Sequence, residues 1–203
     1  MADLSDPPLP AADAAADLED EGLHGPSVRQ VPEGDDRPRL VCPDCGFIAY
    51  ENPKVVVGSV AAWQGRVLLC RRAIEPRTGF WTLPAGYLEL NETSEAGALR
   101  EAWEEARARL ELEGLLAVYN IPRISQVQLI YRARLLAPDV SAGPESREVG
   151  LFAWEDVPWD ELAFPTVHWA LREWHAGAER PLGPAAGNPP TATSDTRPGK
   201  SLV

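Results

Sequence analysis

The sequence predicts an α/β domain with a tail at each end, and three observations support this class. Segments rich in β-branched residues, which are typical of strands, occur together with two segments whose apolar residues recur at helical spacing. Such a mixture is compatible with a sheet covered by helices. These segments lie within residues 51–178 of the 203-residue chain. Residues 1–36 are rich in Ala, Asp and Pro, and residues 179–203 in Pro, Gly, Ala and Thr, so we expect a disordered acidic tail and a flexible tail there.

The formal net charge of −12 is unevenly distributed. Ten acidic residues and one Arg lie in residues 1–36, so the domain itself is less acidic. Broad electrostatic binding to DNA or RNA is disfavoured, whereas a phosphate-bearing small molecule could bind through metal ions that supply positive charge. No run approaches the roughly twenty apolar residues of a membrane span, and no basic segment followed by an apolar one begins the chain. We therefore expect a cytoplasmic protein with neither a membrane nor a nucleic acid as partner.

Residues 37–50 contain a Cys-x-x-Cys knuckle formed by Cys42 and Cys45. Such a knuckle supplies two of the four ligands of a tetrahedral zinc site. No Cys precedes Cys42, His24 is one candidate for a third ligand, and no fourth is evident. Two ligands rarely hold a structural zinc ion, so we expect a degenerate, metal-free turn without Zn²⁺. A nucleic-acid-binding zinc module would depend on these two residues alone, and the acidic charge opposes it.

The domain is expected to open with a β-hairpin. Residues 55–63 are rich in β-branched residues, Gln64-Gly65 is typical of a tight turn, and residues 66–72 would form the partner strand. Within it, Cys70 is expected to be a small buried residue. Further strands are expected at residues 110–121, 126–136 and 147–154, a loop at 138–146, and a second amphipathic helix at 165–177.

Three residues at or beyond the end of the hairpin are candidates for substrate binding. Arg71 and Arg72 could grip phosphate, because a guanidinium group donates two parallel hydrogen bonds to it. Simple solvated charge is the alternative for both. Trp81 could stack on a nucleobase, or it could lie buried beside the turn at Pro84.

Residues 86–108 organise the domain. Ala, Leu, Glu and Arg dominate their second half, which we expect to be a helix with Thr93 as its N-cap. On a helical wheel Glu101, Glu104 and Glu105 fall opposite the apolar residues, so the three carboxylates should share one face. The apolar residues, expected to form the buried face, are Ala96, Leu99, Ala102, Trp103 and Ala106.

Three acids on one helical face predict a metal site. Carboxylates spaced three and four residues apart repel each other unless a positive charge lies among them. Mg²⁺ prefers carboxylate oxygen and is commonly shared with substrate phosphates. Arg100 can also pair with Glu104, four residues on, and hold its orientation.

This stretch resembles the signature of the Nudix hydrolases. The signature reads Gly, five residues, Glu, seven residues, Arg-Glu, an apolar residue, any residue, Glu-Glu, any residue, Gly and an apolar residue. It is met here by Gly86, Glu92, Arg100, Glu101, Ala102, Glu104, Glu105 and Ala108. Arg107 stands where the family has its last Gly, which would allow the helix to run longer and the following turn to differ.

The resemblance implies an α/β/α sandwich with a mixed sheet over about residues 50–178. It also implies Mg²⁺ or Mn²⁺ held by Glu101, Glu104 and Glu105, with the Gly86 carbonyl as a further ligand and Arg100 as support. An additional carboxylate would face the metals, and we prefer Glu148 to the nearby Glu145 for this role. The general base stays open among Glu104, Glu105 and Glu148. By the same resemblance Arg71 and Arg72 lie beside the substrate cleft.

The implied activity is hydrolysis of the pyrophosphate in a nucleoside diphosphate linked to another group. Pro122, fourteen residues beyond Ala108, is similar to the downstream proline of the ADP-ribose class. The stretch from Cys42 to Val127 resembles zinc-ribbon-associated Nudix proteins, so ADP-ribose is the first choice, followed by FAD and NADH. Nudix relatives often form homodimers. The alternative is a catalytically inactive nucleotide sensor on the same fold, which the complete set of three acids opposes.

Overall fold

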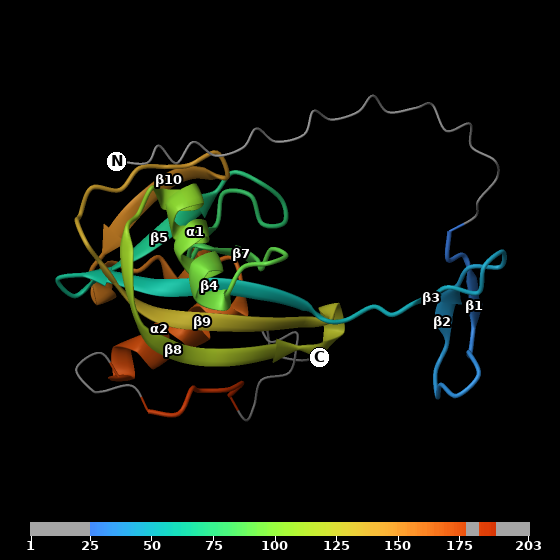
Figure 1. Ribbon diagram of the computed structural model, residues 1–203. Coiled ribbons are helices and arrows are strands. Elements are labelled where there is room, and N and C mark those ends of the chain that lie inside the picture. Colours follow the sequence, from blue (N-terminus) through green and yellow to red (C-terminus); the bar gives the residue numbers. More distant parts are fainter. Residues whose placement is uncertain (1–24, 178–182, 190–203) are drawn as a thin grey trace, which may run out of the picture. The chain divides into compact units, whose positions relative to one another are not determined.

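The computed structural model describes residues 25–177 and 183–189, which fall into two units divided between Glu51 and Asn52 (Figure 1). Our predictions of a disordered tail and a flexible tail, where they concern residues 1–24, 179–182 and 190–203, lie outside the described residues. None of the described helices has the length and apolarity needed to cross a membrane.

The first unit is a small antiparallel sheet. Its strands are β1 (Val28–Gln30), β2 (Arg39–Val41) and β3 (Ile48–Ala49), in that order. Residues 25–36, predicted as part of the acidic tail, are therefore ordered, because β1 pairs with β2. The prediction from amino-acid composition was wrong for this segment, because a strand as short as β1 is held by backbone pairing with β2 and buries no side chains of its own.

The knuckle after β2 is a tight turn. The Cys42 amide donates to the Phe47 carbonyl at 2.8 Å, and the Gly46 amide donates to the Cys42 carbonyl at 3.0 Å. Cys42 is buried and Cys45 exposed. The backbone amide of Cys45, followed by that of Asp44, lowers the pKa of the Cys42 thiol. His24 lies outside the described residues, so whether Zn²⁺ binds here stays a prediction.

The second unit is built on a mixed sheet with strand order β10-β5-β4-β9-β8. The β4–β9 pair is parallel and the other pairs are antiparallel. Two short strands complete the sheet, β6 on β5 and β7 on β4. The bounds are β4 (Lys54–Trp63), β5 (Arg66–Arg72), β6 (Trp81–Thr82), β7 (Ala85–Tyr87), β8 (Leu110–Ile121), β9 (Gln126–Leu135) and β10 (Ser146–Phe152).

Helices cover both faces of this sheet, as the sequence predicted. Alternate residues of one strand point to opposite faces, so Val60 belongs to the core under α2 (Pro165–Gly177), whereas Ala61 belongs to the core under α1 (Ser94–Ala106). Three short 3₁₀ helices complete the unit: η1 (Pro122–Ile124), η2 (Trp154–Asp156) and η3 (Trp159–Glu161).

Strand β4 changes partner along its length, and this change places β7. Its first half pairs with β7 and its last residues pair with β5. Gly58 opposes Ala85, where a Cβ on the glycine would overlap the alanine side chain. The close approach sets Gly86 opposite Val57, on the strand that packs directly against α1.

The buried face of α1 differs from our prediction. Leu99 and Trp103 are exposed, and Glu101 and Glu105 are buried together with Gly97. The remaining buried positions of the helix are the small residues Ala98, Ala102 and Ala106. Small side chains let the helix approach the sheet closely, so two acids are enclosed while the larger apolar groups face outward.

Thr93 caps the start of α1, as predicted, and accepts a hydrogen bond from the Ala96 amide at 3.1 Å. At the other end the helix does not run longer. Arg107 itself takes the left-handed conformation, with φ of 51°, and its amide donates to the Trp103 carbonyl at 2.9 Å. This is the position where glycine is usually found, so the turn is kept although the glycine is absent.

We predict that Arg107→Gly raises the free energy of unfolding by about 0.5–1 kcal/mol. Glycine avoids a left-handed Cβ penalty of about 1–2 kcal/mol, and its larger loss of backbone freedom offsets part of this gain. Urea unfolding at equilibrium measures the change. Arg107→Ala is the matched control, because it keeps the strain and removes the side chain. A glycine variant less stable than the alanine variant would contradict the prediction.

Candidate active site

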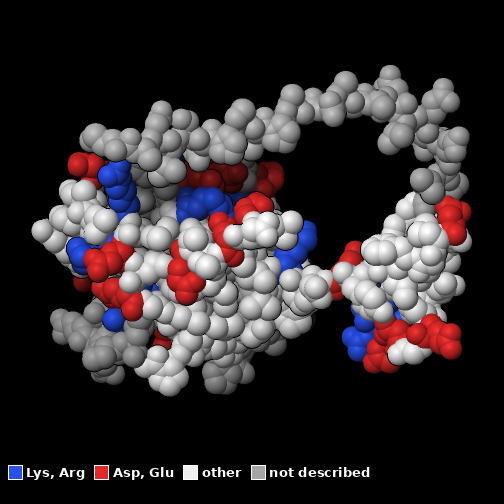
Figure 2. All heavy atoms as spheres, viewed as in Figure 1, with Lys and Arg blue, Asp and Glu red and all other residues white. Residues whose placement is uncertain are grey.

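A cleft of about 950 Å³ opens beside α1. Its acidic side includes the three predicted carboxylates, and Figure 2 shows acidic side chains gathered around this face with basic ones among them. Another part is formed by the end of β8, by η1 and by the start of α2. The lining residues used below are Arg72, Gly86, Arg100, Glu101, Glu104, Glu105, Asn120, Ile121, Pro122, Glu145, Phe164, Trp169 and Asn188.

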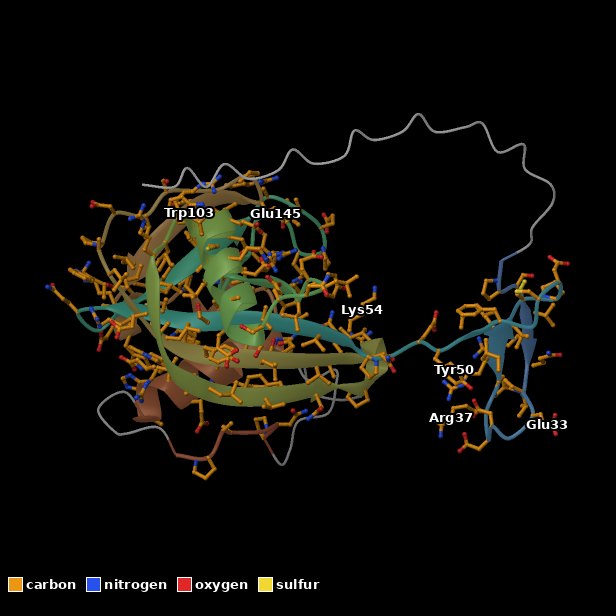
Figure 3. All side chains as sticks on the ribbon, in the orientation of Figure 1. Glu33, Arg37, Tyr50, Lys54, Trp103 and Glu145 are labelled. Atoms are coloured by element: carbon orange, nitrogen blue, oxygen red, sulfur yellow. The ribbon has the colours of Figure 1, made fainter. Side chains whose placement is uncertain are left out.

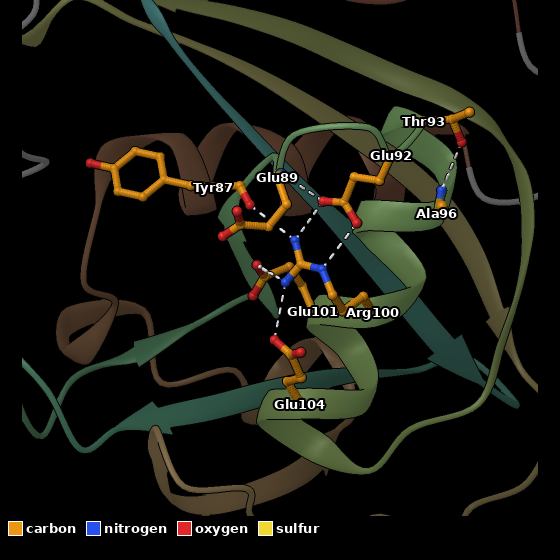
Figure 4. Close-up of polar contacts among 8 residues, drawn as sticks. All are labelled: Tyr87, Glu89, Glu92, Thr93, Ala96, Arg100, Glu101 and Glu104. Carbon is orange, nitrogen blue, oxygen red and sulfur yellow. Dashed lines mark hydrogen bonds and ion pairs between the residues drawn. The ribbon is translucent and has the colours of Figure 1, made fainter. Parts of the chain in front are cut away.

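Arg100 is the hub of the acidic side (Figure 4). Its Nε and Nη2 donate to the two carboxylate oxygens of Glu92 at 3.1 and 2.7 Å. Its Nη1 donates to Glu101 at 2.7 Å and to Glu104 at 3.0 Å. Arg100 therefore orients both acids, and the predicted pairing with Glu104 is confirmed. The same guanidinium lowers the pKa of Glu92 to about 2.

Glu101 and Glu105 are held in a poorly solvated place. They are 8% and 5% exposed. Burial raises the pKa of Glu101, and burial together with the neighbouring Glu101 charge raises that of Glu105 to about 8. Among the described residues, Oε2 of Glu105 is buried without a hydrogen-bond partner. A buried carboxylate oxygen without a donor is unfavourable unless a cation or a proton compensates it.

Gly86 lies directly against Glu101. A Cβ at this position would overlap the Glu101 carboxylate, so no other residue fits without displacing the acid. Together with the unpartnered Glu105 oxygen, this contact leaves carboxylate oxygen and backbone close together and free of side-chain carbon. Such a donor set fits Mg²⁺ or Mn²⁺. Within the described residues, no group of three or more His, Cys, Asp or Glu is placed so that it could hold a metal ion as it stands. Arg100 donates to both Glu101 and Glu104.

A further carboxylate comes from the loop before β10, and it is Glu145. The loop covers the C-terminal carbonyls of α1, since the Ser141 amide donates to Ala106 at 3.0 Å and the Gly143 amide to Glu105 at 2.9 Å. A Cβ on Gly143 would overlap the Glu104 backbone, so the approach requires glycine. Glu145 then reaches the cleft near the end of α1 (Figure 3), and its charge contributes to the raised pKa of Glu105.

Glu148, our preferred additional carboxylate, does not line the cleft. It is exposed and accepts a hydrogen bond from Nη1 of Arg71 at 3.4 Å. A bulge in the pairing of β10 with β5 separates Ser146 from Glu148, and this irregularity could not be read from the sequence. The alternative that we had placed second, Glu145, lines the cleft.

The predicted substrate-binding residues also divide. Arg72 lines the cleft, its guanidinium lies 5.3 Å from the Phe164 ring centre, and its charge acts on Glu105. Arg71 does not line the cleft; its Nε donates to the Gly79 carbonyl at 2.9 Å. Trp81 is 6% exposed and packs edge-on against Phe152 in the core, so it does not reach the cleft. A place in a strand beside the cleft did not predict which side chains reach it, because the side chains of consecutive residues in a strand point to opposite faces of the sheet.

Several lining residues carried no signal in the sequence. Phe164 immediately precedes α2 and Trp169 lies in its first half, a segment whose sequence indicated only an amphipathic helix. Trp169 packs edge-on against Tyr119 at 5.4 Å between ring centres. Asn188 comes from the predicted flexible tail. These residues line the same cleft as the acids only because the folded chain brings distant segments together.

Two protein-family models match this chain. The sequence model of the NUDIX domain matches residues 52–177, which is more than half of the chain. A second model, described as Nudix N-terminal, matches residues 25–51, the small sheet with the Cys knuckle.

Individual proteins are similar to this chain over different shares of its length. A crystal structure of a NUDIX hydrolase from Nitrosomonas europaea is 46% identical, covers 79% of this chain and 93% of its own, and has a TM-score of 0.75. A MutT-like protein of Streptomyces ambofaciens is 43% identical over 79 residues, 39% of this chain and about half (49%) of its own length. An ADP-ribose pyrophosphatase of Methanocaldococcus jannaschii is 29% identical over 119 residues, 57% of this chain and 69% of its own.

We predict that Glu105→Gln makes the metal-free protein more stable at high pH. The native state keeps the Glu105 proton up to about pH 8, whereas an ordinary glutamate releases it near 4.5. The native state therefore binds more protons in this window, and stability falls as the pH rises through it. In EDTA the variant should melt at a higher temperature than the wild type at pH 8, and the difference should vanish toward pH 4.

Glu104→Gln is the matched control for this experiment, because its side chain is half exposed. It should keep the pH slope of the wild type. Addition of Mg²⁺ at pH 8 should raise the melting temperature of the wild type more than that of Glu105→Gln, since a ligand of the native state stabilises it by mass action. If the melting temperatures of wild type and Glu105→Gln changed equally with pH, burial would not raise the pKa of the Glu105 carboxyl, and the prediction would be wrong.

Proposed function

Because the chain belongs to the Nudix family, we propose that it is a divalent-metal-dependent hydrolase that cleaves the pyrophosphate of a nucleoside diphosphate linked to another group. ADP-ribose is the first choice of substrate, followed by FAD and NADH. The observation that carries the proposal is the pair of buried acids, Glu101 and Glu105, on the cleft beside Gly86. The name of the Methanocaldococcus jannaschii relative supports ADP-ribose as the first choice.

The acidic side of the cleft would hold the metal. Glu101, Glu104 and Glu105, with the Gly86 carbonyl, are the proposed ligands. A bound Mg²⁺ or Mn²⁺ would neutralise the anionic phosphates and acidify a water molecule for attack on phosphorus. Arg100 orients Glu101 and Glu104 through its hydrogen bonds, so it acts on the reaction through them.

The chain's own groups provide the remaining chemistry. Arg72 is the proposed phosphate contact, because it lines the cleft and presents a guanidinium group near Glu105. Glu104, Glu105 and Glu145 are the proposed candidates for the general base, with Glu145 in place of Glu148. A base must reach the attacking water, and only the residues on the cleft wall can do so.

The apolar part of the cleft suits the nucleoside. Ile121, Phe164 and Trp169 are partly buried against the core under α2, and they line the cleft on the side of β8 and α2. Apolar and aromatic walls with few polar groups are typical of small-molecule sites. Pro122 lies at the start of η1 in the same wall. Homodimer formation, a cytoplasmic location and the absence of a nucleic-acid partner stay predictions.

We predict magnesium-dependent release of AMP from ADP-ribose, measured by chromatography against a panel that includes FAD and NADH. Glu105→Gln should lower turnover at least about a hundredfold, because it removes a metal ligand or general base without changing the side-chain volume. Retained turnover in this variant would contradict the mechanism. Binding of a panel member without hydrolysis by the wild type would instead favour the inactive sensor.

A second prediction compares two acids that lie three residues apart. Glu145→Gln should lower turnover about tenfold or more, because Glu145 lines the cleft with the buried acids. Glu148→Gln is the matched control; its exposed side chain pairs with Arg71 outside the cleft, and turnover should change less than about twofold. Initial rates at saturating ADP-ribose and Mg²⁺ measure both variants. The reverse order of effects would restore Glu148 to the role that we first assigned to it.

A further inference from the structure

The segment of residues 183–189, predicted as a flexible tail, lies along the edge of β8 (Figure 1). The Val118 amide donates to the Ala186 carbonyl at 2.8 Å, and the Ala186 amide donates to the Leu116 carbonyl at 2.9 Å. Ala186 and Ala117 form a parallel β-bridge, and Ala186 packs against the core under α2. The segment thus pairs with backbone groups that the edge strand would otherwise leave exposed.

The next contact of this segment is made by a side chain. Oδ1 of Asn188 accepts a hydrogen bond from the Asn120 amide at 2.8 Å, and Nδ2 of Asn188 donates to the Asn120 carbonyl at 2.7 Å. The side-chain amide therefore takes the place of a further strand residue opposite Asn120. Two hydrogen bonds in one plane fix the orientation of the Asn188 amide at the end of β8.

Asn188 and Asn120 both line the cleft that contains the three acids. On this wall Ile121, Pro122 and Trp169 present apolar surface, and Arg123, Gln126 and Gln128 also line the cleft. After its two bonds to Asn120, the Asn188 amide keeps one N–H donor and one acceptor lone pair. The wall therefore combines apolar surface with one oriented donor and acceptor, which matches a group with flat apolar faces and polar edges.

We propose that residues 183–189 form a wall of the nucleotide cleft and that Asn188 is a specificity-determining residue that contacts the nucleobase of the substrate. This proposal rests on the proposed function, because it concerns the same cleft. A nucleobase presents donors and acceptors on its edges and apolar faces above and below, and an oriented side-chain amide can pair with such an edge. The phosphates, in contrast, belong with Arg72 and the acids of α1.

The test measures binding by calorimetry without divalent metal, so it does not require turnover. The two ligands are AMP, which carries a nucleobase, and ribose 5-phosphate, which lacks one. Asn188→Ala should weaken AMP binding about tenfold and leave ribose 5-phosphate binding within about twofold of the wild type. Ala186→Pro, which removes the amide that donates to Leu116, should weaken AMP binding at least as much.

Ala185→Ser is the matched control, because Ala185 is exposed in the same segment, and it should bind both ligands like the wild type. Thermal melting shows whether each variant is folded. Three results would overturn the proposal: AMP binding unchanged in Asn188→Ala, both ligands weakened equally, or wild-type protein that binds AMP no better than ribose 5-phosphate. Failure of magnesium-dependent hydrolysis would overturn the proposed function alone, since this binding comparison does not depend on it.

Discussion

Two carboxylates buried side by side on α1 are the constraint on which the rest of the structure depends. Glu101 and Glu105 are one helical turn apart, and burial and mutual repulsion both raise the pKa of Glu105. Arg100 compensates part of this charge through its hydrogen bonds to Glu101 and Glu104, and the charge of Arg72 acts on Glu105. One buried oxygen of Glu105 has no hydrogen-bond donor in the described chain. Because a buried carboxylate oxygen without a partner is unfavourable, this oxygen favours a bound cation.

The backbone around these acids is shaped by close approaches. Gly86 contacts the Glu101 carboxylate, Gly58 lets β7 approach β4, and Gly143 lets the loop before β10 cover the end of α1. Each of these contacts excludes a Cβ. The glycines therefore have one common effect: they bring strand, helix and loop together at the cleft. Arg107 shows the opposite case, because a left-handed turn is kept there by a residue for which that conformation is unfavourable.

The cleft has two chemically different parts. Acids, Arg72 and Arg100 form the part beside α1, and mainly apolar and amide side chains, with Arg123, form the part at the end of β8. A nucleoside diphosphate linked to another group has the same division between charged phosphates and an apolar, polar-edged base. The docked segment of residues 183–189 extends the second part, so an element outside the sheet core contributes to the cleft.

The sequence alone determined the α/β class, most strand positions, Thr93 as the cap of α1, and the pairing of Arg100 with Glu104, and it predicted the three acids that the structure places on the cleft. These features depend on local spacing, propensity and motif, which the order of residues states directly. The sequence did not decide which of Glu145 and Glu148 faces the cleft, where Trp81 points, or which face of α1 is buried. A one-residue bulge decides the first and the choice of sheet face decides the second, and both depend on pairing between distant segments. The third depends on how closely the small residues of α1 let the helix approach the sheet. Likewise Asn188 joins the cleft only because β8 offers an unpaired edge, and that edge exists only in the folded sheet.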